Sequence, residues 1–234
     1  MKLLRKIKYK LKYYISDVPE PKKWVFIVGC SNSGTSLLHT MLSLHPSAVP
    51  PDQMYLDERG AKNIDVLKLK KQWSARFNGV NKPVLLKKSP TNTVRLRWLQ
   101  YHFSPAYFIG IDSNAYAVAE GGRQKYRHVV RLGAKQWKNA NTIMLEDLQK
   151  VAHSKVISDE NLTEHAEQTI HGICDFLEDR SKLNQAFTTH GKTLQITNIN
   201  NESFHRLSKD DIIQIREEAA ERLAQLAYPT PVNL

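Results

Sequence analysis

The sequence contains little cysteine and no long apolar run, and both absences exclude classes of protein. Its 2 cysteines among 234 residues are too few for a disulfide framework or a four-cysteine zinc site. No apolar run approaches the about 18 residues that a membrane-spanning helix requires. Four lysines from position 6 to position 12 interrupt the apolar core that a secretory leader would need. Together these absences predict a cytoplasmic protein with reduced thiols.

Acidic residues are missing from three stretches of the chain. Lys and Arg number 34 against 23 Asp and Glu, which gives a net charge of +11. The surplus is concentrated in residues 1–12, 82–97 and 121–140, which carry six, five and six basic residues and no acidic one. Such a surplus predicts an anionic partner: a nucleic acid, a membrane surface, or a phosphorylated or sulfated small molecule.

The first basic stretch also carries apolar residues at helical spacing up to position 15. It therefore predicts a basic amphipathic helix, which either makes peripheral contact with an anionic membrane or docks on the protein's own surface, the reading we favour. A nucleic-acid surface is disfavoured, because basic residues alternate with aromatic ones only over residues 8–14. We divide the chain into an N-terminal segment, residues 1–20, and a domain, residues 21–234.

Strand and helix patterns alternate along the first half of the domain. Residues 24–29 form a short apolar run typical of a strand buried in a parallel sheet. A loop of small residues follows, and then a leucine-rich helix that ends at His45-Pro46. Strand patterns recur at 83–86, 106–111 and 156–157, and helices are expected at 94–103, 141–152, 163–178 and 208–227, with Thr163 and Ser208 as N-caps. The pattern predicts a single α/β domain, with a central parallel sheet flanked by helices and a helical C-terminal half.

The loop after the first strand fits a phosphate-binding pattern with one exception. Gly29 to Ser36 matches G-x-x-x-x-G-K-[ST], except that Thr35 stands where the lysine belongs. Backbone N–H groups of such a loop and of the following helix converge on a phosphate. Without the lysine that reaches the outer phosphates, a nucleoside triphosphate is disfavoured, and a P-loop kinase ranks lower than a protein that binds a single 5′-phosphate group. A plain tight turn is the alternative.

With Leu37, Leu38 and His45-Pro46 behind it, this loop resembles the 5′-phosphosulfate-binding loop of PAPS-dependent sulfotransferases, most of all the bacterial and tyrosylprotein-like members. Lys88-Ser89-Pro90, residues 108–121 and residues 160–177 are similar to later segments of that family, in the same order, so the likeness covers roughly residues 24–230. It implies transfer of a sulfuryl group from 3′-phosphoadenosine-5′-phosphosulfate (PAPS) to an acceptor hydroxyl, which leaves PAP, with no metal. The acceptor, whether glycan, lipid, peptide or small alcohol, is not identified by the sequence.

The resemblance also implies roles for individual residues. Lys88, or the adjacent Lys87, would stabilise the leaving phosphate, and Asp52 would be the general base. The nucleotide would be bound by Cys30, Ser31, Asn32, Ser33, Gly34, Thr35, Ser36, Ser113, Gly121, Arg123 and Lys192.

Three positions depart from the family's pattern. Asn32 replaces a residue that is commonly basic, Ser113 replaces the arginine that grips the 3′-phosphate, and Gly121 replaces its partner serine. The Ser113 hydroxyl, or a basic residue at position 123, 125, 127 or 192, would have to substitute for the lost charge-assisted contact. If none does, the alternative is a degenerate, non-catalytic relative that binds a nucleotide or a nucleic acid.

Overall fold

The computed structural model describes residues 21–44, 48–49, 65–74, 84–179, 187–189, 192–194 and 196–231. The N-terminal segment, residues 1–20, and Asp52 lie outside the described residues. Predictions that rest on them, including the amphipathic helix and the general base, stay predictions. No helix within the described ranges is both long enough and apolar enough to cross a membrane.

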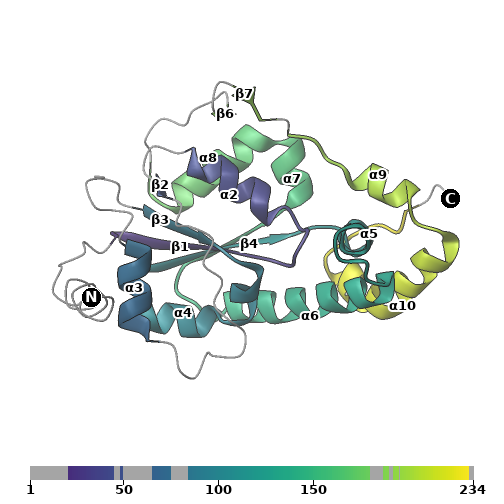
Figure 1. Cartoon of the computed structure of the whole chain (residues 1–234), viewed down its shortest axis with the longest axis horizontal. Helices are drawn as coiled ribbons and strands as arrows, with labels where there is room; N and C mark the ends of the chain where they lie inside the picture. Colours follow the sequence, from purple (N-terminus) through teal and green to yellow (C-terminus); the bar gives the residue numbers. More distant parts are fainter. Residues whose placement is uncertain are drawn as a thin grey trace, which may run out of the picture.

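A five-stranded parallel sheet forms the centre of the protein (Figure 1), which confirms the predicted α/β class. The order across the sheet is β2 (Ala48–Val49), β3 (Val84–Lys88), β1 (Lys23–Val28), β4 (Ala106–Asp112) and β5 (Ser154–Ser158). Every neighbouring pair runs parallel. The central strand β1 is buried from Trp24 to Val28, as its continuous apolar run predicts.

Helices cover both faces of the sheet. In Figure 1, α2, α7 and α8 lie on one face, α3, α4 and α6 on the other, and α5, α9 and α10 stand beyond the carboxyl ends of the strands. Their bounds are α2 (Thr35–Ser43), α3 (Val66–Ser74), α4 (Leu96–His102), α5 (Ala115–Tyr126), α6 (Val130–Leu148), α7 (Asp159–Glu164), α8 (Ala166–Phe176), α9 (Asn200–His205) and α10 (Lys209–Gln225). A 3₁₀ turn, η3 (Pro90–Val94), and an antiparallel pair, β6 (Thr188–Thr189) and β7 (Lys192–Thr193), complete the described elements.

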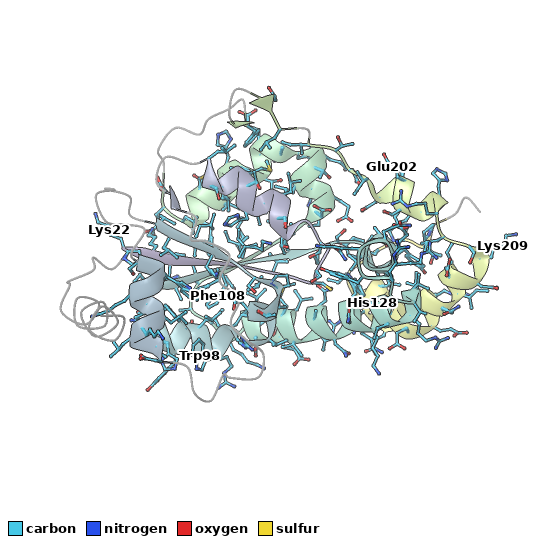
Figure 2. All side chains as sticks on the ribbon, in the orientation of Figure 1. Lys22, Trp98, Phe108, His128, Glu202 and Lys209 are labelled. Carbon is cyan, nitrogen blue, oxygen red and sulfur yellow. The ribbon has the colours of Figure 1, made fainter. Side chains whose placement is uncertain are left out.

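Alternating residues of β1 serve two separate cores. Val25 and Ile27 pack with the α2 and α8 side, whereas Trp24 and Phe26 pack in an aromatic cluster on the other face with Trp73 and Phe103. This is the period of two expected for a strand with helices on both faces. A third core joins α5, α6 and α10, with Trp137 fully buried at its centre. Figure 2 shows the side chains of these helices beyond the carboxyl ends of the strands.

One of the two predicted helix caps is confirmed and one is wrong. Ser208 caps α10 in a reciprocal capping box with Asp211. Thr163 lies inside α7, whose N-cap is Ser158, and the predicted helix 163–178 is broken at His165 into α7 and α8. The hydroxyl of Thr163 instead donates to the carbonyl of Asp159 one turn back, a local bond that competes with capping.

The basic stretch 121–140 forms α5 and α6, and acidic residues of α10 neutralise part of it. Arg131 pairs with Glu217 at 2.7 Å and Lys138 with Glu218 at 2.6 Å. Arg123 on α5 pairs with Asp211 at 2.8 Å. These contacts explain half of the six basic residues as partners of a packed helix, so the stretch as a whole is not a free anionic-ligand surface.

Candidate functional site

Parallel pairing brings the carboxyl ends of β1, β3, β4 and β5 to one edge of the sheet, where ligands of open α/β sheets bind. The register sets Lys88 at the end of β3 beside Ile27 of β1. A cavity of about 580 Å³ opens at this edge. Its wall is built from the loop after β1, the end of β3, α5, the start of α7 and residues 197–206. The predicted site residues on that wall are Ser31, Asn32, Gly34, Thr35, Ser36, Lys88 and Gly121.

The loop after β1 is held open by backbone geometry and by η3. Asn32 and Gly34 have φ angles of 67° and 77°, in the left-handed region, which glycine adopts readily and asparagine tolerates. The hydroxyl of Thr93 accepts from the N–H of Gly29 and donates to the carbonyl of the same residue, both at 2.9 Å. Since η3 begins at Pro90, two residues after Lys88, this double contact fixes the end of β3 to the start of the loop.

Two residues of the loop, Cys30 and Ser33, have buried side chains that do not line the cavity. The fully buried Ser33 hydroxyl is 2.7 Å from the carbonyl of Cys30 and 3.2 Å from that of Ile111 on β4. Cys30 is also buried, and burial raises the pKa of its thiol to about 12. Their side chains thus stabilise the loop. Only their backbone groups remain for the predicted role in nucleotide binding.

The ammonium group of Lys88 lies at the uncapped N-terminus of α2. Gly34 is the N-cap of α2, and among the described residues no side chain caps this helix, so its first N–H groups and its dipole favour an anion. The ammonium of Lys88 donates to the hydroxyl of Ser36 at 3.1 Å. Burial and the nearby Lys125 lower the pKa of Lys88. The Ser36 hydroxyl, the Lys88 ammonium and the N-terminus of α2 therefore lie together, and their predicted role in binding a phosphosulfate stays a prediction.

Lys87, the alternative to Lys88, points to the opposite face of the sheet. Its ammonium lies 5.2 Å from the centre of the Trp73 ring, in the aromatic core, and only 2% of the residue is exposed. Burial, with a further effect of Lys88, lowers the pKa of Lys87 to about 8. Strand alternation accounts for the difference, because consecutive residues of β3 face opposite ways.

An acidic residue that the sequence analysis missed lies against the loop. Asp159, the first residue of α7, lines the cavity, and a Cβ placed on Gly34 would stand only 2.0 Å from its Oδ1. Burial and the neighbouring Glu160 raise the pKa of Asp159 to about 6. Asp159 directly follows β5, and the pairing of β5 with β4 brings it to the same edge as the loop.

Ser113, at the position of the expected arginine, lies in a closed polar cluster. Its side chain donates to Glu160 Oε1 at 3.2 Å, and that oxygen also accepts from Asn114 N–H at 3.0 Å and Asn200 Nδ2 at 2.7 Å. The Tyr228 hydroxyl lies 3.1 Å from the other oxygen of Glu160. Ser113 is 1% exposed and is not on the cavity wall, so the structure ties its hydroxyl to a carboxylate.

Asp112, at the end of β4, belongs to the same cluster through Tyr228. Its Oδ1 accepts from the Tyr228 hydroxyl at 2.7 Å. Burial and the Glu160 carboxylate raise the pKa of Asp112 to about 6, against the lowering effect of the Tyr228 bond. Tyr228 follows α10, so the segment after this helix contacts the sheet at the point where β4 ends.

The other predicted 3′-phosphate residues are dispersed. Gly121 reaches the cavity wall beside the loop, where an added Cβ would lie 3.4 Å from the Cβ of Asn32. Arg123 donates to Asp211 at 2.8 Å and to the carbonyl of Arg206 at 2.7 Å, and it is not on the wall of this cavity. Lys192 belongs to β7 by its backbone, and its side chain lies outside the described atoms.

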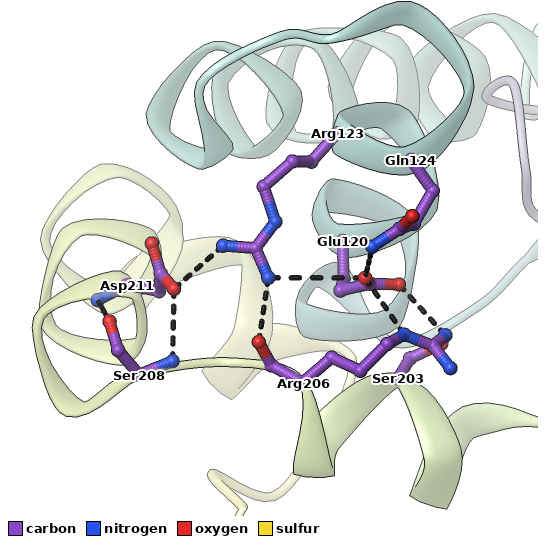
Figure 3. Close-up of polar contacts among 7 residues, drawn as sticks. All are labelled: Glu120, Arg123, Gln124, Ser203, Arg206, Ser208 and Asp211. Atoms are coloured by element: carbon purple, nitrogen blue, oxygen red, sulfur yellow. Dashed lines mark hydrogen bonds and ion pairs between the residues drawn. The ribbon is translucent and has the colours of Figure 1, made fainter.

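An ion pair that the sequence did not predict also lies on the cavity wall (Figure 3). Arg206, which ends α9, donates from Nε and Nη2 to the two oxygens of Glu120 on α5, both at 2.9 Å. The Glu120 side chain is fully buried. Burial opposes ionisation of Glu120, but hydrogen bonds from Arg206 and Gln124 outweigh it and lower its pKa. Within the described part of the chain, no three metal-ligating side chains gather in one place.

No protein-family model matches the chain, and no curated protein matches it in sequence. Solved structures do match. The sulfotransferase domain from the curacin biosynthetic pathway aligns with a TM-score of 0.61 at 19% identity, over 88% of this chain and 98% of that one. Sulfotransferase STF9 from Mycobacterium avium gives 0.62 at 11% identity, over 94% and 80%. Mouse sulfotransferase SULT7A1, complexed with PAP, gives 0.57 at 10% identity, over 86% and 84%.

The structural neighbours of this chain are therefore sulfotransferases, and the chain has their fold. The resemblance found in the sequence is confirmed at that level. Identities of 10–19% establish the architecture alone, since one fold hosts many activities.

Proposed function

We propose that this protein is a sulfotransferase that transfers the sulfuryl group of PAPS to a hydroxyl of its acceptor. The observation that carries the proposal is the 3.1 Å contact between Lys88 Nζ and Ser36 Oγ at the uncapped start of α2. It supplies a cation, a hydroxyl and helix N–H groups on one wall of a cavity large enough for a nucleotide. The sulfotransferase fold, and PAP in the complex of the mouse protein, favour this nucleotide over others.

The assignment of roles follows from the charge that moves in the reaction. Transfer breaks the bond between the sulfur and the bridging oxygen of PAPS and forms a bond from the sulfur to the acceptor oxygen. The electron pair of the broken bond stays on the 5′-phosphate, where Lys88, Ser36 and the N-terminus of α2 stabilise it. The acceptor's proton passes to a base, for which we retain Asp52 from the sequence.

Binding of PAP, the product nucleotide, tests the proposal without knowledge of the acceptor. We expect calorimetric titration to show binding to the wild-type protein. Lys88→Ala removes a charge-assisted contact worth about 1.5–3 kcal/mol, so the dissociation constant should rise about tenfold to a hundredfold. Transfer from ³⁵S-labelled PAPS to a panel of sugars, lipids, tyrosyl peptides and small alcohols should fall further, because Lys88 acts on charge that develops in the transition state.

Two other lysines serve as controls. Lys150→Ala removes an exposed ammonium at the opposite edge of the sheet, next to Asp147, and should leave PAP binding unchanged. Lys87→Met keeps an apolar stem beside Trp73 and should also retain binding. No PAP binding by a folded wild-type protein at millimolar nucleotide would overturn the proposal, and equal losses in all three variants would remove Lys88 from it.

A non-catalytic nucleotide-binding relative is the second candidate. It is favoured by the Ser113 hydroxyl, which is bound to Glu160 where the family's arginine would contact phosphate. This candidate predicts PAP binding with no sulfuryl transfer to any acceptor in the panel and no release of sulfate from PAPS. Transfer to one acceptor, lost in Lys88→Ala, decides against it.

A further inference from the structure

The expected place for the 3′-phosphate is closed in this chain, which raises the question of where that phosphate would bind. Ser113 is buried and donates to Glu160. Glu160 Oε1 already accepts three hydrogen bonds there, from Ser113, Asn114 and Asn200. A phosphate at that point would meet a carboxylate, and like charges at short range repel. The 3′-phosphate therefore needs another donor.

Arg206 offers one on the same cavity wall as the loop after β1. It lies at the end of α9, and its side chain is 43% exposed. Nε and Nη2 point to Glu120, and Nη2 also contacts the hydroxyl of Ser203 at 3.1 Å. Among the described residues, Nη1 makes no hydrogen bond within the protein. One edge of the guanidinium is thus bound to the protein, and the N–H groups of Nη1 remain available.

The surrounding contacts hold this guanidinium in one orientation (Figure 3). Glu120 is buried and is fixed in turn by Gln124 at 2.8 Å. The guanidinium of Arg123 also approaches it, at 3.9 Å. A planar donor held in this way loses little conformational freedom when it binds a phosphate oxygen. Figure 3 also shows that the guanidinium of Arg123 lies between Glu120 and Asp211 and donates to Asp211.

Lys125, the basic residue of α5 on this wall, belongs to the 5′ side. Lys125 lines the cavity, and its charge is one of the causes that lower the pKa of Lys88, so the two ammonium groups lie within electrostatic range. Lys125 then adds to the charge around the 5′-phosphosulfate, and Arg206 remains for the second phosphate.

We propose that Arg206, held by Glu120, binds the 3′-phosphate of the nucleotide from α9, in place of an arginine in the turn between β4 and α5. This inference rests on the proposed function, because it assumes a nucleotide with two separate phosphate groups. It makes Arg206 the residue that distinguishes PAP from adenosine 5′-monophosphate (AMP), which lacks the 3′-phosphate.

Calorimetric titration of the same protein with PAP and with AMP tests the inference. We expect the wild-type protein to prefer PAP by at least about tenfold, the value of one charge-assisted contact. Arg206→Gln should reduce the preference to less than about threefold by weakening PAP binding while AMP binding stays the same. Arg131→Gln, which breaks the exposed pair with Glu217, should leave the preference intact. An unchanged PAP preference in Arg206→Gln would overturn the inference.

Glu120→Gln provides a test of opposite sign, should Arg206→Gln fail to fold because Glu120 is left buried and unpaired. With the neutralising carboxylate gone, Arg206 attracts the phosphate more strongly, and the PAP preference should rise. A purely structural ion pair predicts lower thermal stability in this variant with no rise in the preference, and that result would also overturn the inference. If the wild-type protein binds neither nucleotide, the proposed function itself fails, which is a distinct outcome.

Discussion

The two sides of the cavity are built from different kinds of contact. On the loop side, residues that follow β1 meet the end of the neighbouring strand β3 and the turn after it, through the Lys88–Ser36 contact and the bonds between Thr93 and Gly29. On the side of α5, α9 and α10, the ion pairs join positions 86 and 88 residues apart, Glu120 to Arg206 and Arg123 to Asp211. The first side is a motif fixed by backbone geometry, and the second is an assembly of charges that depends on how the helices pack.

Gly34→Ala should break the loop side and have the largest effect. The left-handed φ of 77° disfavours alanine, and the new Cβ would lie 2.0 Å from Asp159 Oδ1. Strain and overpacking together should lower the free energy of unfolding by about 2–5 kcal/mol. Urea denaturation measures this change. PAP binding should fall below detection in the protein that remains folded, because the loop can no longer keep its shape.

Gly172→Ala is the matched control for that substitution. Gly172 lies inside α8, where an added Cβ would meet Lys155 Nζ at 3.7 Å, an ordinary contact. Alanine should therefore stabilise the protein by about 0.5–1 kcal/mol. The double variant Gly34→Ala, Asp159→Ala should recover the part due to overpacking and not the part due to φ. A loss of equal size at both glycines would contradict the account.

The same contrast explains what the sequence could predict. The apolar run of β1, the small-residue loop and Lys88 carry local patterns, and all three lie where the patterns place them. Asp159 was missed because its place beside Gly34 depends on the pairing of β4 with β5. No local period encodes that pairing.

Arg206 and the basic stretch 121–140 were beyond sequence reasoning for the same reason. A run of basic residues shows its charge but not its partners, and here the partners are acidic residues of α10 that lie 80 to 88 positions further on. Only the packing of α10 against α6 and α5 reveals which charges are already neutralised. Lys125 remains on the cavity wall, whereas Arg123 turns away from it.

Asp159 should make anion binding at the loop dependent on pH. The pKa of this carboxyl in the free protein is about 6, so it is ionised at pH 7.5, and an anion bound next to it raises that pKa further. Binding then takes up a proton, and affinity for PAP should fall as the pH rises from 5.5 to 7.5. If the bound anion raises the pKa by about one unit, Asp159→Asn should tighten PAP binding about fivefold to tenfold at pH 7.5.

Measuring the PAP affinity of the wild-type protein and of Asp159→Asn at several pH values separates the effect of the Asp159 carboxyl from other titrations. The phosphates of PAP titrate in both, and Asp112, whose pKa is also about 6, is retained in both. Only the difference between the wild-type and Asp159→Asn binding curves, measured by calorimetry from pH 5.5 to pH 7.5, reports Asp159. Parallel curves, with a constant ratio of dissociation constants, would rule out the role of Asp159.

Gly121→Ser should sharpen the contrast with the smallest effect, because it adds one hydroxyl where the two sides of the cavity meet. A Cβ at Gly121 has room, 3.4 Å from the Cβ of Asn32, and one added hydrogen bond to the 3′-phosphate is worth about 0.5–1.5 kcal/mol. PAP binding should tighten about threefold to tenfold, and AMP binding should not change. Gly122→Ser lies one residue further along α5 and off this wall. It should leave PAP binding unchanged and raise only the stability of the helix, by the small propensity gain that both variants share. An equal rise in affinity for PAP and AMP would show that the 3′-phosphate does not contact position 121. Arg206 would then be the remaining proposed contact of that phosphate.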